Sequence, residues 1–157
     1  MRILQICSKF HYSVSSGSTI VAYQISKELV NRGNNVIVYT SDMKDKYTRL
    51  KSEVRKMDGI TVNRFHSIVT ALTREIKIFV TPEIIKKVNK EITSFDVVHI
   101  HEYRTFQNFI IHHYAKKFGI PYVLQAHGTL PSIMPNKLLK LIYDFFFGYR
   151  LLRDARK

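Results

Sequence analysis

The chain has 157 residues, 45% of them hydrophobic, and a formal net charge of +13 at pH 7. A chain of this length and apolar content folds as one domain with a sizeable core, which excludes a disordered protein. The single cysteine, Cys7, excludes a disulfide framework and a cysteine-based metal site, and the charge favours an anionic partner. The sequence shows neither a signal-peptide pattern nor an apolar run of the ~18 residues that a membrane span needs, so we expect a cytoplasmic protein.

Strand and helix patterns alternate along the chain. Apolar runs predict strands, and apolar residues at helical spacing, with Gly33 and Gly119 at C-cap positions, predict helices. The basic stretch at 42–59 indicates loop with some helix, and residues 67–81 give no clear pattern. In chain order the prediction is strand 2–8, helix 19–33, strand 35–41, strand 60–66, helix 81–95, strand 96–102, helix 105–119, strand 120–128 and helix 135–157.

This alternation predicts an α/β domain whose mostly parallel sheet is covered by helices on both faces. Ligands of such sheets bind outside the carboxyl ends of the strands, where the strand order reverses. The residues that the predicted strands bring to that edge are Ser15, Ser16, Gly17, Ser18, Thr40, Ser41, Phe65, His66, His99, His101, Glu102, Tyr103, His127, Gly128 and Thr129.

Several of these residues have a structural interpretation as well as a functional one. Ser16-Gly17-Ser18 either holds a phosphate at the start of a helix or only caps that helix. His127 either contacts a ligand or occupies a tight turn. His99 and His101 point to the same face of a strand, but no third ligand is evident, so we expect no metal site. The basic residues are spread along the chain, which disfavours nucleic-acid binding.

Taken together, three segments resemble the N-terminal domain of a GT-B glycosyltransferase of the large retaining family 4. They are SSGSTIVAYQISKELVNRGNNVIVYTS, then DVVHIHEYRTFQNFIIHHYAKKFGIPYVLQAHGTLP, and finally the helix KLLKLIYDFFFGYRLLRDARK. Each motif is weak alone, but together they occur in the family's order and at matched spacing over nearly the whole chain. The resemblance therefore implies a Rossmann-like, three-layer domain that forms the N-terminal half of a GT-B fold.

The resemblance also implies roles for residues at the strand ends. Ser16 stands where the family commonly has a first glycine, and its Cβ limits how closely the backbone approaches a phosphate. The implied catalytic residue is His127, the implied donor phosphate and sugar contacts are Ser16, Gly17, Gly128 and Thr129, and the implied acceptor contacts are His101, Glu102 and Tyr103.

The implied reaction transfers a sugar from a nucleotide-sugar donor to a glycan or lipid-linked acceptor with retention, without a metal or other cofactor. In the family, most of the donor site lies in a C-terminal domain with an E-x7-E motif, and the sequence does not contain that domain. We therefore expect residues 1–157 to form a single N-terminal, acceptor-side domain that is inactive alone. The alternative is a non-catalytic Rossmann-like module that binds a phosphorylated or sugar ligand.

The helix predicted over 135–157 has a broad apolar face with basic flanks. For this fold the favoured interpretation is that the apolar face packs on the sheet. The alternative is that the helix, with the basic stretch 44–56, lies peripherally on an anionic membrane surface such as the inner face of the cell membrane. A lipid-linked acceptor would fit that alternative.

Overall fold

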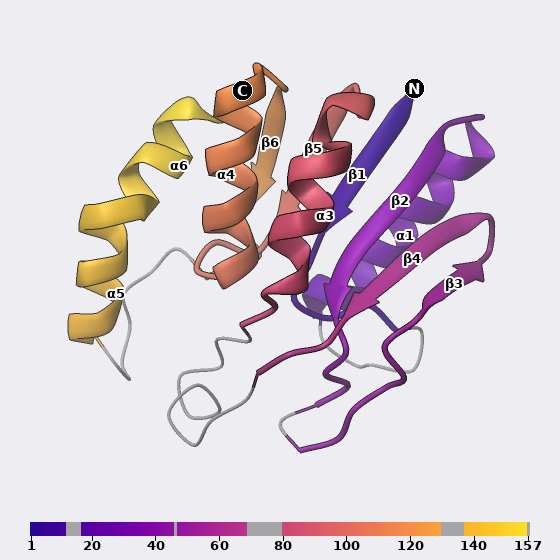
Figure 1. Cartoon of the computed structure of the whole chain (residues 1–157), viewed down its shortest axis with the longest axis horizontal. Helices are drawn as coiled ribbons and strands as arrows, with labels where there is room; N and C mark the ends of the chain where they lie inside the picture. The colour runs from indigo at the N-terminus through magenta and orange to yellow at the C-terminus, as the bar shows by residue number, and fades with distance from the viewer. Residues whose placement is uncertain (12–16, 46, 69–79, 130–136, 157) are drawn as a thin grey trace.

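The computed structural model describes residues 1–11, 17–45, 47–68, 80–129 and 137–156, which contain one six-stranded sheet of order β3-β4-β2-β1-β5-β6 (Figure 1). Every neighbouring pair is parallel except β3 and β4. The strands are β1 Arg2–Ile6, β2 Asn35–Ser41, β3 Val54–Met57, β4 Ile60–Phe65, β5 Val97–His101 and β6 Tyr122–Gln125. The predicted α/β class with a mostly parallel sheet is confirmed.

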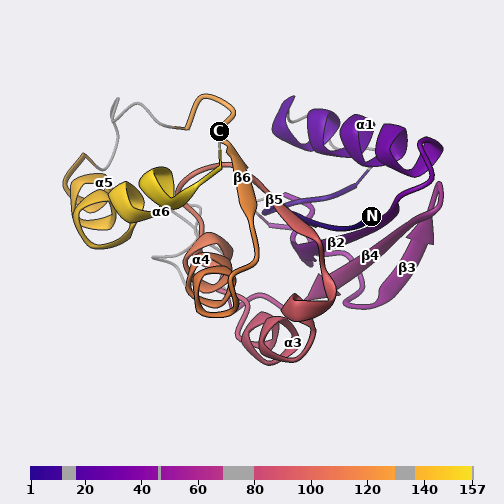
Figure 2. The same cartoon turned by 90° about the horizontal axis from the view of Figure 1, so that it is seen from above.

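Helices cover both faces of the sheet (Figure 2). Helix α1, Gly17–Asn31, packs on β2 and β4 on one face, where Ala22 meets a core that includes Val38 and Val62. Helices α3, Glu83–Glu91, and α4, Phe106–Phe118, cover the opposite face and enclose the larger core. Strand β2 is apolar on both sides, with Val38 in one core and Ile37 and Tyr39 in the other, because each face is buried, as expected for parallel strands.

The strand order reverses at β1, because β2 and β4 lie on one side of it and β5 and β6 on the other. The carboxyl ends of the parallel strands point to the same edge of the sheet, at the lower side of Figure 1. We call this the strand-end edge. The predicted switch point therefore lies where β1 and β5 end, next to the start of α1.

Two predictions about local structure are wrong. The described residues of 42–59 contain no helix; they form an isolated bridge between Met43 and Arg49 and then the edge strand β3, antiparallel to β4. Asp58 and Gly59 both have positive φ and connect β3 to β4, a two-residue hairpin turn that the Asp-Gly pair favours. The helix predicted from residue 81 begins as α3 only at Glu83, and the buried Thr81 hydroxyl has no hydrogen-bond partner among the described residues.

Helix α4 has the ends that its sequence predicts. The Thr105 hydroxyl caps it by accepting a hydrogen bond from the Asn108 N–H at 3.2 Å. Gly119 ends it in the left-handed conformation, with φ of 69°. These caps fix the short connections on either side of α4, which lead from the end of β5 and into β6.

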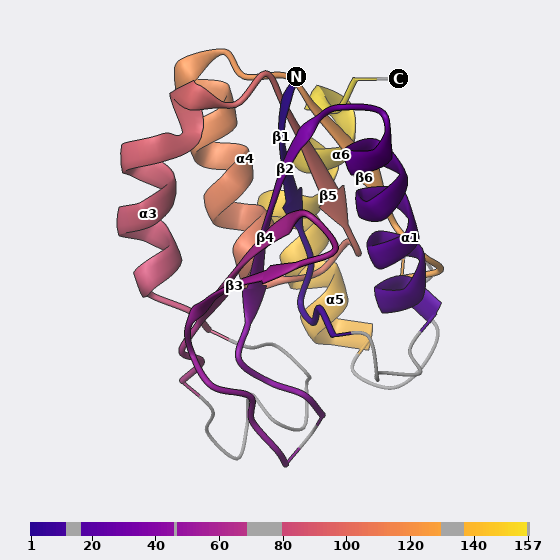
Figure 3. The same ribbon diagram turned by 90° about the vertical axis from the view of Figure 1, so that its right-hand side faces the viewer.

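The C-terminal helical segment, which lies behind the sheet in the view of Figure 3, is less buried than predicted. It consists of α5, Lys137–Tyr143, a π-helical turn, Asp144–Gly148, and α6, Tyr149–Asp154. Among the described side chains of this segment only Leu151 joins the core, and Ala155, directly after α6, packs against it. The expectation that its apolar face packs on the sheet is wrong for the exposed side chains of Leu138, Leu141, Ile142, Phe145, Phe146, Phe147, Tyr149 and Leu152.

One ion pair holds this helical segment to the end of β5. Arg104 Nη2 lies 2.6 Å from Asp144 Oδ2, and both side chains are about nine-tenths buried, at 10% and 9% exposed. Arg104 also donates to the carbonyl of Thr129. Gly148 packs so closely here that a Cβ would overlap the Tyr103 hydroxyl and lie 2.7 Å from Asp144 Oδ1. The π-helical turn thus places Asp144 and Gly148 beside the strand-end edge.

Candidate functional site at the strand ends

The tight turn after β6 holds His127. The Thr129 N–H donates to the Ala126 carbonyl at 3.0 Å, and the two central residues, His127 and Gly128, have φ of 49° and 77°. Positive φ at both central positions is the pattern of a type I′ turn. It costs glycine little but costs a histidine on the order of 1 kcal/mol. Histidine in a strained conformation at the ligand-binding edge of the fold is typical of a functional position.

A chain of hydrogen bonds connects His127 to the interior of the sheet. Its Nε2 lies 2.9 Å from Nδ1 of His101, and Nε2 of His101 lies 2.6 Å from Oε1 of Gln5. The two imidazole rings are almost parallel, 13° apart, with centres separated by 5.2 Å. His99 lies against His101 with ring centres 4.1 Å apart. We call Gln5, His99, His101 and His127 the histidine cluster.

The histidine cluster is uncharged at neutral pH. Burial lowers the pKa of His101 to about 3, and the neighbouring His99 and His127 lower it further in the same direction. Burial and the proximity of His127 lower the pKa of His99 to about 4. Burial also lowers the pKa of the half-buried His127, while the Glu102 carboxylate opposes that shift. The cluster therefore offers neutral imidazole nitrogens, not positive charge, to a ligand.

Glu102 joins three segments at the switch point. Its carboxylate accepts from the Ser8 N–H at 3.3 Å and from the Ser18 hydroxyl at 3.1 Å, so it connects the end of β5 to the loop after β1 and to the start of α1. Its φ of 70° is again left-handed. The carboxylate places negative charge beside the start of α1, where a donor phosphate was predicted, and this charge would repel such a phosphate.

The predicted acceptor contacts differ in exposure. His101 and Tyr103 are buried, with 0% and 1% of their surface exposed, whereas Glu102 is half-buried. The Tyr103 N–H donates to the Thr129 hydroxyl at 2.9 Å, and that hydroxyl donates to the Ala126 carbonyl at 2.5 Å. Thr129 thereby ties the turn after β6 to the end of β5. His101 and Tyr103 thus support the exposed residues of the site from the protein interior. That they contact an acceptor stays a prediction.

The predicted donor contacts lie on two loops. Gly128 and Thr129 are exposed in the turn beside His127. Gly17 is the exposed first residue of α1, and a Cβ there would meet no atom within 4 Å among the described residues. The open space beside Gly17 is compatible with a ligand. Ser16 lies outside the described residues.

Other predicted edge residues form a separate group where β2 and β4 end. Asp42 is buried and accepts hydrogen bonds through Oδ2 from Arg49 at 2.7 Å and through Oδ1 from the Ser67 N–H at 3.0 Å. Its Oδ2 also lies 3.1 Å from Nδ1 of the exposed His66. We call Asp42, Arg49, His66 and Ser67 the aspartate cluster. Asp42 and Arg49 were not predicted as partners, because their contact depends on the loop between them.

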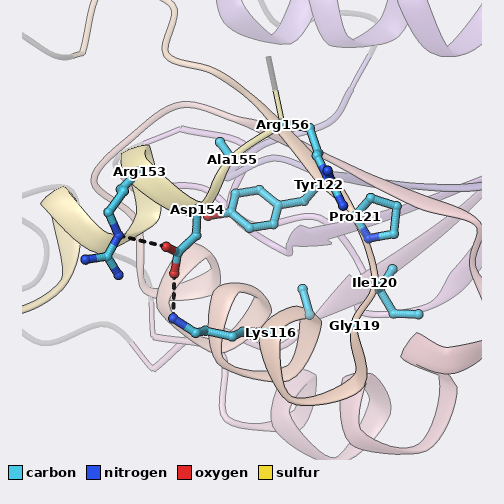
Figure 4. Close-up of a pocket in the computed structure, with 10 residues that line it drawn as sticks. Lys116, Gly119, Ile120, Pro121, Tyr122, Arg153, Asp154, Ala155 and Arg156 are labelled. Atoms are coloured by element: carbon cyan, nitrogen blue, oxygen red, sulfur yellow. Dashed lines mark hydrogen bonds and ion pairs between the residues drawn. The ribbon is translucent and has the colours of Figure 1, made fainter.

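A cavity of about 430 Å³ lies at the other end of the sheet, away from these clusters (Figure 4). It is bounded by the end of α4, the start of β6 and residues 153–156. Asp154 lies between Lys116 and Arg153, with Lys116 Nζ at 2.8 Å and Arg153 Nε at 3.0 Å. Hydrogen bonds from Lys116, His112 and Arg153 hold the pKa of Asp154 below its usual range. Lys116 and Arg153 are already paired with Asp154, and the predicted site residues do not line this cavity.

Gln5 is the site residue that was missed. Gln5 is a wholly buried polar residue in the otherwise apolar run ILQI of β1. A glutamine inside such a run is the sequence signal that indicates a buried polar contact. Cys7, directly after β1, is buried, and its burial raises the pKa of the thiol. Within the described part of the chain, no group of three or more His, Cys, Asp or Glu residues is arranged to hold a metal ion.

A comparison with known protein families gives a match over most of the chain. The sequence model of the family described as Glycosyltransferase Family 4 matches residues 15–157. This match includes the start of α1, both histidine-bearing strand ends and the C-terminal helices. No curated protein matches the chain. With more than half of its residues matched by the family model, the chain belongs to glycosyltransferase family 4.

Proposed function

We propose that this domain forms the acceptor side of a retaining glycosyltransferase that uses a nucleotide-sugar donor. The observation that carries the proposal is the position of His127, which is held in a strained turn at the switch-point edge of a family 4 domain. The sugar would leave the donor phosphate as the bond to its anomeric carbon breaks. A new bond would form to an acceptor hydroxyl on the same face of the sugar, and the proton of that hydroxyl would leave with the phosphate.

His127 suits a role in binding and charge stabilisation. It is half-buried and neutral, and one of its ring nitrogens is engaged by His101, which leaves the other for a sugar hydroxyl. A prepositioned hydrogen-bonding group at the reacting sugar stabilises the charge that develops in the transition state. We assign His127 this role in place of a nucleophile, and Gly17, Gly128 and Thr129 the role of contacts to the donor.

We also propose that a second, donor-binding domain completes the site. At the switch point the described residues place the carboxylate of Glu102 beside α1 and neutral histidines beside β6, and neither supplies positive charge to a diphosphate. A separate domain that binds the phosphates would supply that charge. We therefore expect the isolated chain to turn over little or no donor. We also expect the complete enzyme to need no metal.

The test is a transfer assay with the enzyme that carries this domain, over a panel of nucleotide sugars. We expect His127→Ala to lower kcat by about 100-fold or more, the usual loss when a transition-state hydrogen bond is removed. His113→Ala is the matched control, since His113 is an exposed histidine on α4, and it should leave kcat unchanged. Wild-type turnover by His127→Ala would reject the assigned role. Donor binding without any transfer would favour the non-catalytic module.

The exposed side chains of the C-terminal helices support a proposal about location. Phe145 and Phe146 are 74% and 55% exposed on the π-helical turn, and Lys140 and Arg150 flank them. Among the described residues, no helix is long and apolar enough to cross a bilayer. An aromatic surface flanked by cations, on a chain of net charge +13, is complementary to an anionic bilayer surface. We propose that this segment lies on such a surface and brings the site to a lipid-linked acceptor.

Vesicle co-sedimentation tests the membrane proposal. The chain should bind phosphatidylglycerol vesicles more strongly than phosphatidylcholine vesicles, and Phe145→Ser with Phe146→Ser should abolish most of the binding. Val54→Ser is the control, because Val54 is 65% exposed on β3, away from the helices. Binding that survives the double substitution, or no binding by the wild type, would overturn the proposal. Self-association that depends on the two phenylalanines would identify a second copy as the occupant instead.

A further inference from the structure

We propose that Gln5 and His101 are positioning residues that hold His127 in one tautomer, protonated on Nε2, with Nδ1 left as a hydrogen-bond acceptor for a ligand hydroxyl. The inference rests on the proposed function only for the identity of the ligand. It uses the three connected side chains Gln5, His101 and His127, which come from three different strand ends.

The direction of each hydrogen bond follows from the one before it. Oε1 of Gln5 is a carbonyl oxygen and can only accept, so Nε2 of His101, 2.6 Å away, carries the proton. Neutral His101 then has a bare Nδ1, which accepts from Nε2 of His127 at 2.9 Å. Neutral His127 in turn has its lone pair on Nδ1. In the described part of the chain, no side chain or backbone group engages that atom.

The hydrogen bonds that connect Gln5, His101 and His127, which we call the relay, control the tautomer because burial shields the inner bond from water. Gln5 and His101 are both 0% exposed, so water does not compete for the hydrogen bond between them. The His101 ring is also held by the His99 ring at 4.1 Å, which restricts its rotation. An exposed histidine exchanges its ring proton between the two nitrogens freely, whereas here a change of the His127 tautomer breaks one hydrogen bond, either between His127 and His101 or between His101 and Gln5.

The orientation of the Gln5 amide decides the outcome. Its Nε2 is buried without a hydrogen-bond partner among the described residues, so only the contact between Oε1 and His101 fixes the amide. Turned by 180°, the amide would donate to His101, every bond in the relay would reverse, and His127 would present an N–H to the ligand. The two arrangements select opposite chemistry: a bare Nδ1 accepts from a sugar hydroxyl, and a protonated Nδ1 donates to an oxyanion.

Long-range ¹H–¹⁵N correlation spectra of the chain, labelled with ¹⁵N-histidine, test this directly at pH 7. We expect His127 to show a protonated-type shift at Nε2 and an unprotonated-type shift at Nδ1, while the exposed His113 shows averaged shifts. His127→Gln and His113→Gln assign the two sets of peaks. A His127 protonated on Nδ1, or averaged like His113, would overturn the proposal. The spectra involve no donor or acceptor, so this result is independent of whether the proposed sugar transfer is correct.

Two variants test the part played by Gln5. Gln5→Leu should move the His127 shifts toward averaged values, and Gln107→Leu, which removes another buried glutamine from α4, should leave them unchanged. Gln5→Glu also accepts from His101, so it should preserve the His127 tautomer and raise the pKa of His101 by about one unit or more. If Gln5→Leu does not fold, Gln5→Glu decides, and an unchanged His101 pKa in that variant contradicts the relay.

Discussion

The histidine cluster and the aspartate cluster lie at the same edge of one sheet, yet they are built in opposite ways. The histidine cluster joins β1, β5 and β6 through neutral rings whose pKa values are lowered by burial. The aspartate cluster follows β2 and β4 and pairs the buried carboxylate of Asp42 with Arg49, whose side chain is 36% exposed. In the histidine cluster, Nδ1 of His127 remains available to a ligand. In the aspartate cluster, both carboxylate oxygens of Asp42 are engaged by other residues of the chain.

This difference supports the proposal that the histidine side binds a ligand, whereas the aspartate side holds loops in place. Parallel strands bring polar residues to one edge, and the fold alone does not say which of them bind a ligand. The left-handed φ values of His127 and Glu102 occur on the histidine side, where β5 and β6 end. On the aspartate side, hydrogen bonds from Arg49 and from the Ser67 N–H satisfy Asp42. We therefore assign binding to the histidine side and loop anchoring to the aspartate side.

The largest effect that separates the clusters is acid sensitivity. His99 and His101 have pKa values of about 4 and about 3 when folded, against an ordinary 6.5. Below pH 6.5 the unfolded chain takes up protons at these positions and the folded chain does not, so stability is full above pH 6.5 and falls toward pH 4. We expect the free energy of unfolding to fall by about 4 kcal/mol between pH 7 and pH 5 from the two together.

Urea titrations at a series of pH values measure this fall. His101→Gln should reduce the slope of unfolding free energy against pH in that window, whatever its effect on stability at pH 7. The control His113→Gln changes an exposed histidine on α4, the helix that follows β5, and should preserve the slope. A slope that His101→Gln leaves intact would contradict a neutral, buried His101.

The next effect concerns the aspartate side and should be smaller. Asp42→Ala removes the acceptor for Arg49 and for the buried Ser67 N–H. We expect a loss of about 2 kcal/mol in the free energy of unfolding, reduced from the cost of breaking a fully buried pair because Arg49 is partly exposed. Asp45→Ala, in the same loop but exposed, should cost clearly less. Equal losses from both variants would remove the anchoring role of Asp42.

Much of the fold followed from the sequence, because parallel strands and capped helices have strong local signals. The second strand was predicted at the residues where β2 lies, and Thr105 and Gly119 mark the ends of α4. Strand β3 was missed because its residues, Val54–Met57, are exposed or nearly so and lack a buried face that would produce apolar alternation. The exposure of the C-terminal aromatic side chains was also missed, since an apolar helix face looks the same in sequence whether or not a neighbour covers it.

The candidate site was predictable only one residue at a time. His127 was identified by its position after a strand, and the spacing of His99 and His101 placed them on one face. The contact of His101 with Gln5 was not predictable, because it joins residues 96 positions apart through the pairing of β1 and β5. The hydrogen bonds that Glu102 accepts from Ser8 and Ser18 likewise depend on which strands are neighbours. Residue types indicated where the site lies, and strand order determined which side chains meet.

The smallest predicted effect concerns Glu102, whose charge is the one carboxylate influence on the pKa of His127. Glu102→Gln keeps the size of the side chain but removes its charge, and it weakens the hydrogen bonds from the Ser8 N–H and the Ser18 hydroxyl. We expect a loss of about 1 kcal/mol in stability and a lower pKa for His127, measurable by NMR titration. Glu53→Gln, near the aspartate side, should leave the His127 pKa unchanged. If Glu102→Gln leaves it unchanged too, the charge of Glu102 serves to hold α1 and does not tune the histidine. A lowered pKa would instead make Glu102 the residue that limits how far burial depresses His127.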